Sequence, residues 1–488
     1  MTHQFNTKST FDEGTYLGTT AAGSNLSPGC AEGQLCWNGS AVPLSTPYIW
    51  VPWTGVGGVL RYNTDTGAEA GPFPIGVVPS WPSSAGAAYG FSPSRTSVNA
   101  FDQTVWVADR GFSADYSAVY RSSVAHLDSN GHMLCFADVP GVARALATDA
   151  LGNAWVGSFS NSYMIQFSGT EFEPGSASPP RCKTLRYVPV QGNPYGAAAD
   201  NNNSIWVQGG SYITAIDANT GTIAAVYGPG CAPYGITVDR DYVWLGCYAS
   251  EGISRITKAT GAVNFVYTGG NPRGIASSRD GYVYAADNAN HIIRMNRVTM
   301  AFSRITIPTL WQAQMIQGVA VDNADRVWAI DYHGLLTRMN GDGSNQVTLG
   351  APGRSFYTYT DLTGQQTINA GLTPGLWTVV YDSNYIATPK ARWMRLTLDV
   401  TKPSNSTISA RVKVANTVAG LSSVPWWNGQ AVPGVTRAEE FRLENNGLIP
   451  LDDIALPRRR YIQIQVKLTT TRDSVTPVVR SLAVTWSP

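Results

Sequence analysis

The chain has 488 residues, and its 34 lysines and arginines nearly balance its 33 aspartates and glutamates, giving a formal net charge of +1. This balance gives no electrostatic case for nucleic-acid binding, and no run approaches the roughly 18 apolar residues that a membrane span needs. Hydrophobic residues make up 43% of the chain and charged residues only 14%, against about 25% charged residues in an average soluble domain. We therefore expect a folded, turn-rich β protein of the kind common among secreted proteins.

Residues 1–44 form an N-terminal extension that begins with MTHQFNTKSTFDEG. This start has no apolar segment of the kind found in a signal peptide. The stretch STFDEGTYLGTT within it has two expected places. It packs on the C-terminal domain, or it closes the repeat domain that follows.

Residues 45–352 repeat one phrase. It reads GVAVDNADRVWAID at 318–331 and GIASSRDGYVYAAD at 274–287, and related phrases begin at residues 145, 196 and 235. The aromatic residue of the phrase falls at seven places, namely Trp50, Trp106, Trp155, Trp206, Trp244, Tyr284 and Trp328. By subtraction, successive aromatics lie 56, 49, 51, 38, 40 and 44 residues apart. Periods of roughly 40–50 residues are typical of β-propellers.

Each repeat predicts one propeller blade of four short strands. In the last repeat these are GVAVD, RVWAID, LLTRMN and NQVTL, separated by the turns NAD and GDG. A single blade cannot bury both of its faces, so each needs a neighbour on either side. We count seven units, with approximate bounds of 45–88, 89–139, 140–188, 189–228, 229–268, 269–307 and 308–352. The first unit lacks a strand before PYIWV, so its closure requires a strand from elsewhere in the chain.

Residues 353–488 follow a different pattern, in which apolar and polar residues alternate. Met394, Leu396, Leu398 and Val400 share one face of a predicted strand, and the even-numbered residues of 462–468 share a face of another. Such half-buried antiparallel strands predict a β-sandwich. The fold class is therefore all-β: a seven-bladed β-propeller followed by a C-terminal β-sandwich.

The repeats resemble those of virginiamycin B lyase-like propellers, which are relatives of the NHL-type propellers. The residues that carry the resemblance are PYGITVDRDYVWLG with ISRITKATG, and PRGIASSRDGYVYAADNANHIIRMN. The family phrase is approximately P-x-G-I-A-x-x-x-D-G-x-[VL]-W-F-T-E, followed by N-x-I-x-R-I. The C-terminal part resembles a β-sandwich module that is appended to secreted and surface proteins of bacteria.

The resemblance implies a candidate metal-dependent site. Such lyases open a cyclic lactone with a Glu and His residues around a channel-bound Mg²⁺, and the Glu ends the family phrase. At that position this chain has no Glu, but it has Asp109, Asp287 and Asp331, and His333 gives the last an acid-x-His order. Carboxylates in one register suit Ca²⁺ or Mg²⁺, which prefer oxygen ligands. In the alternative, each Asp accepts backbone N–H bonds at the end of a strand.

The residue before the first strand of successive repeats predicts a binding site. Equivalent positions on successive blades converge at one mouth of the axial channel. They are occupied by large polar or aromatic side chains: Arg144, Tyr195, Tyr234, Arg273 and Gln317. Such groups stack on sugar rings or aromatics and hydrogen-bond to hydroxyls. In the alternative, they only plug the channel and cap strand ends.

Two adjacent tryptophans in the C-terminal part, Trp426 and Trp427, give a second candidate surface. They form a platform for carbohydrate stacking, or they belong to the sandwich core.

Six cysteines bear on the compartment of the protein. They are Cys30, Cys36, Cys135, Cys182, Cys231 and Cys247, and none has the CxxC spacing of a zinc site. Cys231 and Cys247 flank a predicted hairpin, and Cys30 and Cys36 are close enough to staple a loop. Disulfides imply an extracellular, cell-surface or periplasmic protein; the alternative is six buried thiols in the cytosol.

The function expected from these features is binding or adhesion outside the cytoplasm, without catalysis. The partner is a glycan or a surface protein, recognised by the propeller mouth or by the sandwich. Two alternatives remain. One is a metal-dependent, lyase-like enzyme acting in the channel, and the other is a structural, self-assembling subunit of a cell-surface assembly.

Overall fold

A computed structural model describes most of the chain. The described residues are 1–17, 19–21, 31, 33–37, 47–75, 92–100, 103–112, 121–174, 179–200, 203–308, 315–366, 375–388, 390–403, 406–424, 426, 441–443, 447–452, 456–470 and 476–488. The chain divides into two compact units, one formed by Pro43–Gly371 and the other by Met1–Val42 with Leu372–Pro488. Among the described residues, no helix is long and apolar enough to cross a bilayer.

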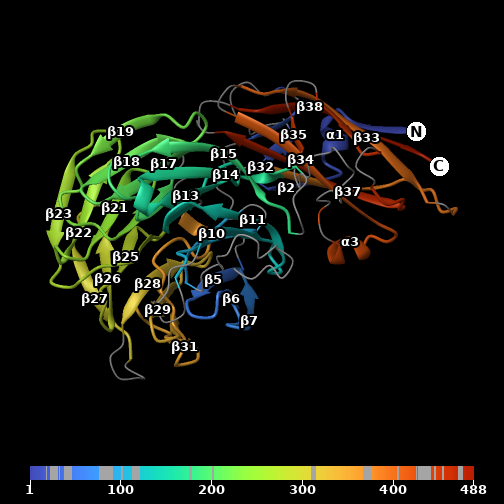
Figure 1. The fold of residues 1–488 in the computed structure, drawn as a ribbon. Coiled ribbons are helices and arrows are strands. Elements are labelled where there is room, and N and C mark those ends of the chain that lie inside the picture. Colours follow the sequence, from blue (N-terminus) through green and yellow to red (C-terminus); the bar gives the residue numbers. More distant parts are fainter. Residues whose placement is uncertain are drawn as a thin grey trace. The chain divides into compact units, whose positions relative to one another are not determined.

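The unit Pro43–Gly371 is built from small antiparallel sheets that follow one another along the chain (Figure 1). Each is a meander in which consecutive strands are neighbours. The second sheet contains β8 (Pro93–Val98), β9 (Val105–Asp109), β10 (Ser122–Leu127) and β11 (Met133–Val139). The third contains β12 (Ala143–Thr148), β13 (Ala154–Ser158), β14 (Tyr163–Phe172) and β15 (Cys182–Pro189). The fourth contains β16 (Gly196–Ala199), β17 (Ser204–Gly209), β18 (Tyr212–Asp217) and β19 (Ile223–Tyr227).

Three further sheets repeat the same four-stranded meander. The fifth contains β20 (Gly235–Val238), β21 (Tyr242–Cys247), β22 (Gly252–Thr257) and β23 (Val263–Tyr267). The sixth contains β24 (Ile275–Ser277), β25 (Tyr282–Ala286), β26 (His291–Asn296) and β27 (Phe302–Thr306). The seventh contains β28 (Ile316–Val321), β29 (Val327–Asp331), β30 (Leu335–Met339) and β31 (Val347–Gly350).

The first sheet has three strands of its own and takes a fourth from the far end of the unit. Its strands are β5 (Tyr48–Trp53), β6 (Gly58–Asn63) and β7 (Glu69–Pro74). Residues 355–362, the closing segment, run beside β5: Thr54 N donates to Ser355 O at 2.9 Å, and Trp50 N donates to Leu362 O at 2.9 Å. The strand missing before PYIWV is therefore supplied from beyond the seventh sheet. The closing segment therefore belongs to the same unit as the seven sheets.

The hydrophobic core shows that the seven sheets form a closed ring. Among the described residues, seven buried clusters each draw on two successive sheets, including one that joins the seventh sheet to the first. In that last cluster, Trp328 and Ile330 of β29 lie with Val51 of β5 and with Phe356 of the closing segment. Each sheet thus buries both faces against neighbours, as the repeat predicts. The unit is a seven-bladed β-propeller.

The Asp and the aromatic residue of the repeated phrase are hydrogen-bonded to each other. Trp206 Nε1 donates to Asp200 at 2.7 Å, and Trp244 Nε1 donates to Asp239 at 2.9 Å. The same bond joins Trp155 to Asp149, Trp328 to Asp322 and Tyr284 to Asp280. The carboxylates also accept backbone N–H bonds within their own turns. In these five blades the phrase therefore fastens the inner turn to the next strand.

The turn that follows the closing segment is hydrogen-bonded to two inner strands near their C-terminal ends. Thr363 Oγ1 donates to Val321 O of β28 at 2.6 Å. Gln366 Nε2 donates to Thr237 Oγ1 of β20 at 3.0 Å. One stretch of chain thus ties the fifth and seventh blades together at this end, and the opposite end, where the inner strands begin, is the one that carries the predicted mouth residues.

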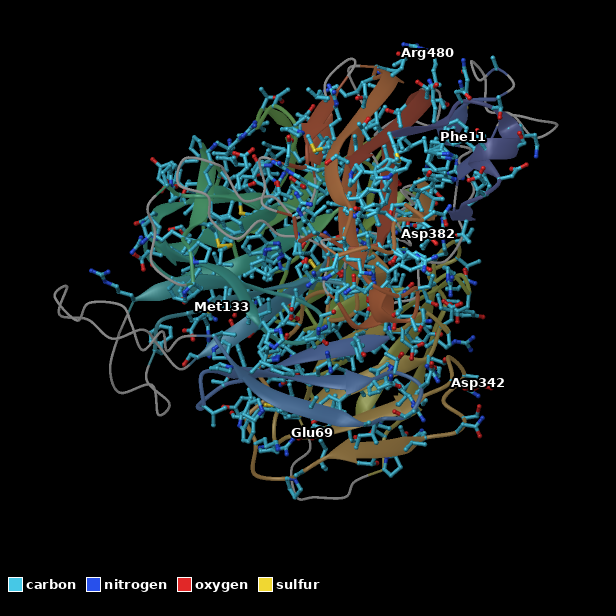
Figure 2. All side chains as sticks on the ribbon, turned by 90° about the vertical axis from the view of Figure 1, so that its right-hand side faces the viewer. Phe11, Glu69, Met133, Asp342, Asp382 and Arg480 are labelled. Atoms are coloured by element: carbon cyan, nitrogen blue, oxygen red, sulfur yellow. A yellow bond between two sulfur atoms is a disulfide. The ribbon has the colours of Figure 1, made fainter. Side chains whose placement is uncertain are left out.

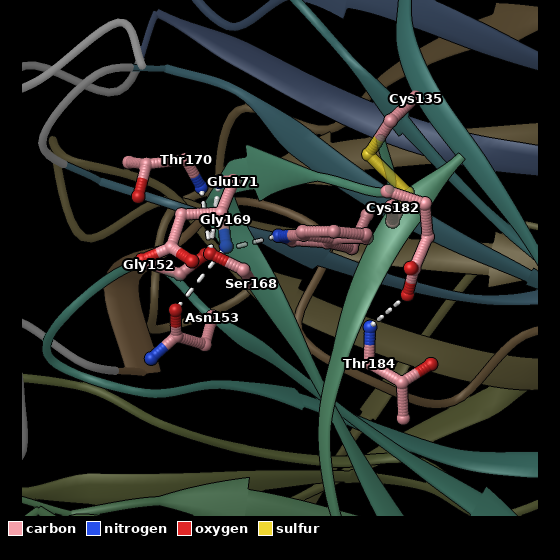
Figure 3. The surroundings of a disulfide bond; sticks show 11 residues. Cys135, Gly152, Asn153, Ser168, Gly169, Thr170, Glu171, Cys182 and Thr184 are labelled. Atoms are coloured by element: carbon pink, nitrogen blue, oxygen red, sulfur yellow. Dashed lines mark hydrogen bonds between the residues drawn. A yellow bond between two sulfur atoms is a disulfide. The ribbon is translucent and has the colours of Figure 1, made fainter. Parts of the chain in front are cut away.

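Two disulfides stabilise the propeller. Cys135 of β11 is bonded to Cys182 of β15, so this disulfide joins the outer strands of the second and third blades (Figure 3). Cys231 is bonded to Cys247 at the end of β21, across the hairpin that the sequence indicated. Cys36 is disulfide-bonded as well, and Cys30 lies outside the described residues.

The other unit contains two antiparallel sheets. One comprises β1 (Thr2–Phe5), β3 (Thr19–Ala21), β4 (Leu35–Trp37), β33 (Arg392–Thr401), β36 (Leu448–Pro450) and β38 (Val478–Ser487). The other comprises β2 (Thr15–Leu17), β32 (Gly375–Asp382), β34 (Ser406–Ala415), β35 (Phe441–Leu443) and β37 (Tyr461–Thr470). Side chains from both sheets form one buried cluster, to which Phe11 of the short helix α1 (Lys8–Phe11) also belongs (Figure 2). The helix α3 (Gly420–Ser423) follows β34.

The alternation predicted for the C-terminal strands is present with one exception. Leu396, Leu398 and Val400 are buried in β33, but Met394 is only half-buried. A β-bulge between Trp393 and Arg395 shifts the register, so Trp393 takes the core position instead. The N-terminal extension joins these sheets, because β1 pairs with β38 and β2 pairs with β32.

Candidate ligand-binding site

The structure brings four of the five predicted mouth residues into one aromatic and cationic cluster. The rings of Tyr195 and Tyr234 have their centroids 5.0 Å apart. The Arg144 guanidinium lies 5.2 Å from the Tyr195 ring centroid, and that of Arg273 lies 5.1 Å from the Tyr234 ring centroid. Gln317 is buried beside them on β28 and donates from Nε2 to the Met315 sulfur at 2.8 Å.

The closing segment adds two tyrosines that the sequence did not indicate. Tyr357 Oη lies 2.6 Å from Tyr234 Oη and 3.1 Å from Tyr195 Oη. Tyr359 stacks on Tyr195 at 5.7 Å between centroids, and its hydroxyl lies 3.4 Å from that of Tyr357. Four phenols from three blades thus meet at one point. The sequence feature that could have identified these two tyrosines is the alternation YTYT, which places both rings on one face of a strand.

Arg95 of β8 is the second residue that sequence reasoning missed. Its side chain is fully buried, and its guanidinium lies 3.5 Å from the Tyr359 ring centroid. Nη1 donates to Ser94 O at 2.8 Å, whereas Nε and Nη2 have no hydrogen-bond partner among the described residues. Arg95 lies in the stretch SRTSV, which lacks the repeated phrase, so no pattern marked it.

The charges in the cluster shift the pKa values of its members. Burial lowers the pKa of Arg95 to about 9, so this guanidinium still carries its proton at neutral pH. Burial opposes ionisation of Tyr357, but Arg95, hydrogen bonds from Tyr195 and Tyr234, and Arg144 together outweigh it and lower the pKa of Tyr357 to about 8. Burial raises the pKa values of Tyr195 and Tyr234. Tyr357 is therefore the phenol that most readily offsets the positive charge.

A hollow of about 510 Å³ opens beside this cluster. Its lining includes Tyr195 and Tyr234 together with Phe159, Gln208 and Tyr212. This volume lies within the range of about 300–1,000 Å³ that is typical of small-molecule sites. The lining is aromatic and polar, and it contains no Asp or Glu.

The carboxylates proposed as metal ligands are each engaged by neighbouring groups. Asp109 accepts bonds from the backbone N–H groups of Ser92 and Gly111, and burial raises its pKa to about 7. Asp287 accepts from Ala289 N at 3.0 Å, and burial raises its pKa.

Asp331 and His333 are the one pair of these residues in contact. Asp331 Oδ1 lies 3.1 Å from His333 Nδ1, and the carboxylate also accepts from Met315 N at 2.9 Å. Within the part of the chain that the structure describes, no three His, Cys, Asp or Glu side chains form a group that could hold a metal ion. Each of the three carboxylates thus accepts backbone N–H bonds, as the alternative interpretation expects.

Trp426, in the other unit, is half-buried and lies beside two cations. The Arg411 guanidinium is 4.4 Å and the Lys413 ammonium 4.8 Å from its ring centroid. Trp427 lies outside the described residues.

Comparison with known proteins finds similarity only among solved structures. No family model and no curated protein matches the chain. A streptogramin B lyase is 20% identical, over 53% of this chain and 83% of that chain, with a TM-score of 0.43. A catalytically inactive virginiamycin B lyase from Staphylococcus aureus, solved with quinupristin, is 17% identical over 53% of this chain and 84% of that chain, with a TM-score of 0.42. The computationally designed Ika8 protein is 11% identical over 64% of this chain and 86% of that chain, with a TM-score of 0.45. The structural neighbours thus include the lyase whose repeats the sequence resembles, and at these identities the likeness concerns the fold alone.

Proposed function

We propose that the protein binds a glycan at the mouth of its propeller, without catalysis, and that it works outside the cytoplasm. The observation that carries this proposal is the convergence of Tyr195, Tyr234, Tyr357 and Arg144 beside an open hollow. Aromatic faces suit the C–H faces of sugar rings, and phenol and guanidinium groups hydrogen-bond to hydroxyls.

Binding explains these donors better than plugging does. A side chain that serves only as a plug has its polar atoms satisfied by the protein, because an unpaired buried donor costs about 1–3 kcal/mol. At the mouth, Nε of Arg144 and Nε of Arg273 are buried without a hydrogen-bond partner among the described residues. A ligand with oxygen acceptors would supply the missing partners.

The disulfides support a location outside the cytoplasm. The Cys135–Cys182 and Cys231–Cys247 bonds form in oxidising compartments and are rare in the cytosol. An extracellular, cell-surface or periplasmic protein meets free glycans and glycan-coated partners there.

The test is a glycan-array screen of the whole chain, compared with its Tyr234→Ala variant. We expect binding that Tyr234→Ala reduces at least tenfold, because this ring and its hydroxyl lie at the centre of the cluster. The matched control is Tyr267→Ala, which removes an exposed tyrosine at the outer edge of the fifth blade. Absence of glycan binding, or equal loss in both variants, would overturn the proposal.

A further inference from the structure

The propeller mouth contains one fully buried and two half-buried arginines that have no carboxylate partner among the described residues. No ion pair in the described part of the chain includes Arg95, Arg144 or Arg273. Arg95 is fully buried, and two of its three nitrogens lack a partner among the described residues. Buried charges in proteins are normally paired, because an isolated one costs several kcal/mol.

Arg326 and Arg338, elsewhere on the propeller, have protein partners. Arg326 pairs with Asp322 at 2.8 Å and with Asp65 at 2.7 Å. Arg338 donates to two backbone carbonyls, those of Thr64 and Asp65. Arg255 and Arg294, away from the mouth, each have a buried Nε without a partner among the described residues. The mouth differs because two such guanidinium groups, those of Arg95 and Arg144, face the same tyrosine ring.

We propose that the mouth recognises an oxyanion, so that the glycan of the proposed function is an acidic saccharide. This inference rests on the proposed function and adds the chemical class of the ligand. Arg95 and Arg144 face the same ring, at 5.5 Å and 5.2 Å from the Tyr195 centroid. Both groups have buried N–H donors without a partner among the described residues, and guanidinium groups are the usual means of binding carboxylate, sulfate or phosphate.

The tyrosines complete the site for such a group. The hydroxyls of Tyr195, Tyr234 and Tyr357 lie within 3.1 Å along a chain of contacts, and each is able to donate a hydrogen bond to an oxygen. Tyr357 is also the acid in contact with these cations that ionises most easily, and its lowered pKa reflects the same excess of positive charge. A bound anion offsets the positive charge that ionised Tyr357 offsets in the free protein.

Calorimetric titration of the whole chain at pH 7 distinguishes the sources of the oxyanion. The probes are tetragalacturonate, its full methyl ester, a sulfated galactose tetrasaccharide, and free inorganic sulfate. We expect at least tenfold tighter binding of the carboxylated or the sulfated saccharide than of the neutral ester. The affinity should fall between about 50 and 300 mM NaCl, because salt screens the charge interaction.

Two variants assign the binding to the mouth. Arg144→Gln, at a half-buried position, should weaken binding of the charged saccharide at least tenfold while leaving the neutral ester unchanged. The matched control is Arg294→Gln, since Arg294 stacks on Tyr282 at 3.6 Å, away from the mouth. Circular dichroism and thermal unfolding of both variants verify that they fold.

The remaining outcomes separate this inference from the proposed function. Equal binding of acid and ester would overturn the oxyanion and leave the glycan proposal standing. Binding of free sulfate that is lost in Arg144→Gln, without binding of any saccharide, would support the oxyanion site and overturn the glycan proposal. No binding of any probe would overturn both.

Discussion

Tyr357 occupies the centre of the mouth, where two other phenols and several cations face it. Arg95 comes from β8, Arg144 from β12, and the guanidinium of Arg110 lies 4.5 Å from the Tyr357 ring centroid. The phenol oxygens of Tyr234 and Tyr195 lie 2.6 Å and 3.1 Å from its own, and Tyr332 and Tyr359 contact its ring. No Asp or Glu among the described residues hydrogen-bonds to this phenol, so the cations dominate its ionisation.

We predict that one tyrosine ionises near pH 8 in the folded protein. Spectrophotometric titration at 295 nm should show this step, and Tyr357→Phe should abolish it, because the pKa of Tyr357 is lowered to about 8 from an ordinary value of about 10. The unfolded chain then holds more protons than the folded one between about pH 8 and 10, so this group makes folding more favourable as pH rises through that window. Tyr267→Phe should leave the step unchanged, because Glu251 raises the pKa of Tyr267. A titration that begins only near pH 10 in the unmodified protein contradicts the assignment.

The Asp of the repeated phrase stabilises the propeller. Asp322 is fully buried and accepts bonds from Trp328 Nε1, from Arg326 Nε and from two backbone N–H groups. We predict that Asp322→Ala lowers the free energy of unfolding by about 3 kcal/mol, because it leaves a buried indole and a guanidinium unsatisfied. Urea denaturation gives the value. Asp342→Ala, at an exposed turn, is the control and should leave the free energy of unfolding almost unchanged; similar losses in both variants would refute the structural role.

At the scale of the element, the closing segment decides whether the ring is complete. Phe356 is fully buried in the cluster shared by the first and seventh blades. We predict that Phe356→Ala destabilises the propeller by about 3–5 kcal/mol, as expected for removing a buried phenylalanine. Val347→Ala, on the exposed outer strand β31, should change the stability by less than about 0.5 kcal/mol. If thermal unfolding of the two variants coincides, the segment does not close the ring.

The disulfide between β11 and β15 constrains two neighbouring blades. Its cysteines are 47 residues apart in sequence, and the chain-entropy model gives about 4 kcal/mol for a loop of that length. We predict that, under oxidising conditions, the double variant Cys135→Ala with Cys182→Ala unfolds at a lower denaturant concentration than the unmodified protein. The same midpoint with and without the bond contradicts a stabilising role.

The repeated phrase made it possible to predict the mouth residues that recur in successive blades. It gave no indication of the mouth residues that come from segments without the phrase. Tyr195, Tyr234, Arg144 and Arg273 occupy one position of the phrase, so their convergence follows from the periodicity. Tyr357 lies beyond the seventh repeat, and only the folded ring shows that its strand pairs with β5.

Arg95 and Met394 show two further limits of sequence reasoning. In β8 the repeated phrase is missing, and a bulge lies between Pro93 and Arg95. The sequence therefore did not show which residue of this strand faces the mouth. In β33 another bulge exchanges Met394 for Trp393 in the core. Alternation assumes an unbroken pleat, and a one-residue insertion reverses the faces.

For the whole molecule, the propeller is a rigid ring whose two channel ends differ. A turn of the chain is bonded across one end, at Val321 and Thr237. The other end carries phenols and unpaired guanidinium groups beside a hollow of about 510 Å³. The repeat builds the scaffold and supplies Arg144 and Arg273, and positions without the phrase add Arg95 and Tyr357 to the mouth.

The measurement that most directly tests whether the propeller mouth binds an acidic saccharide is a crystal structure of the whole chain with tetragalacturonate at saturating concentration. We predict a carboxylate within hydrogen-bond distance of the guanidinium groups of Arg95 or Arg144, with a sugar ring against Tyr195 or Tyr234. A ligand seated elsewhere, such as on Trp426, or a mouth that stays empty, would contradict the assignment of the propeller mouth as the binding site.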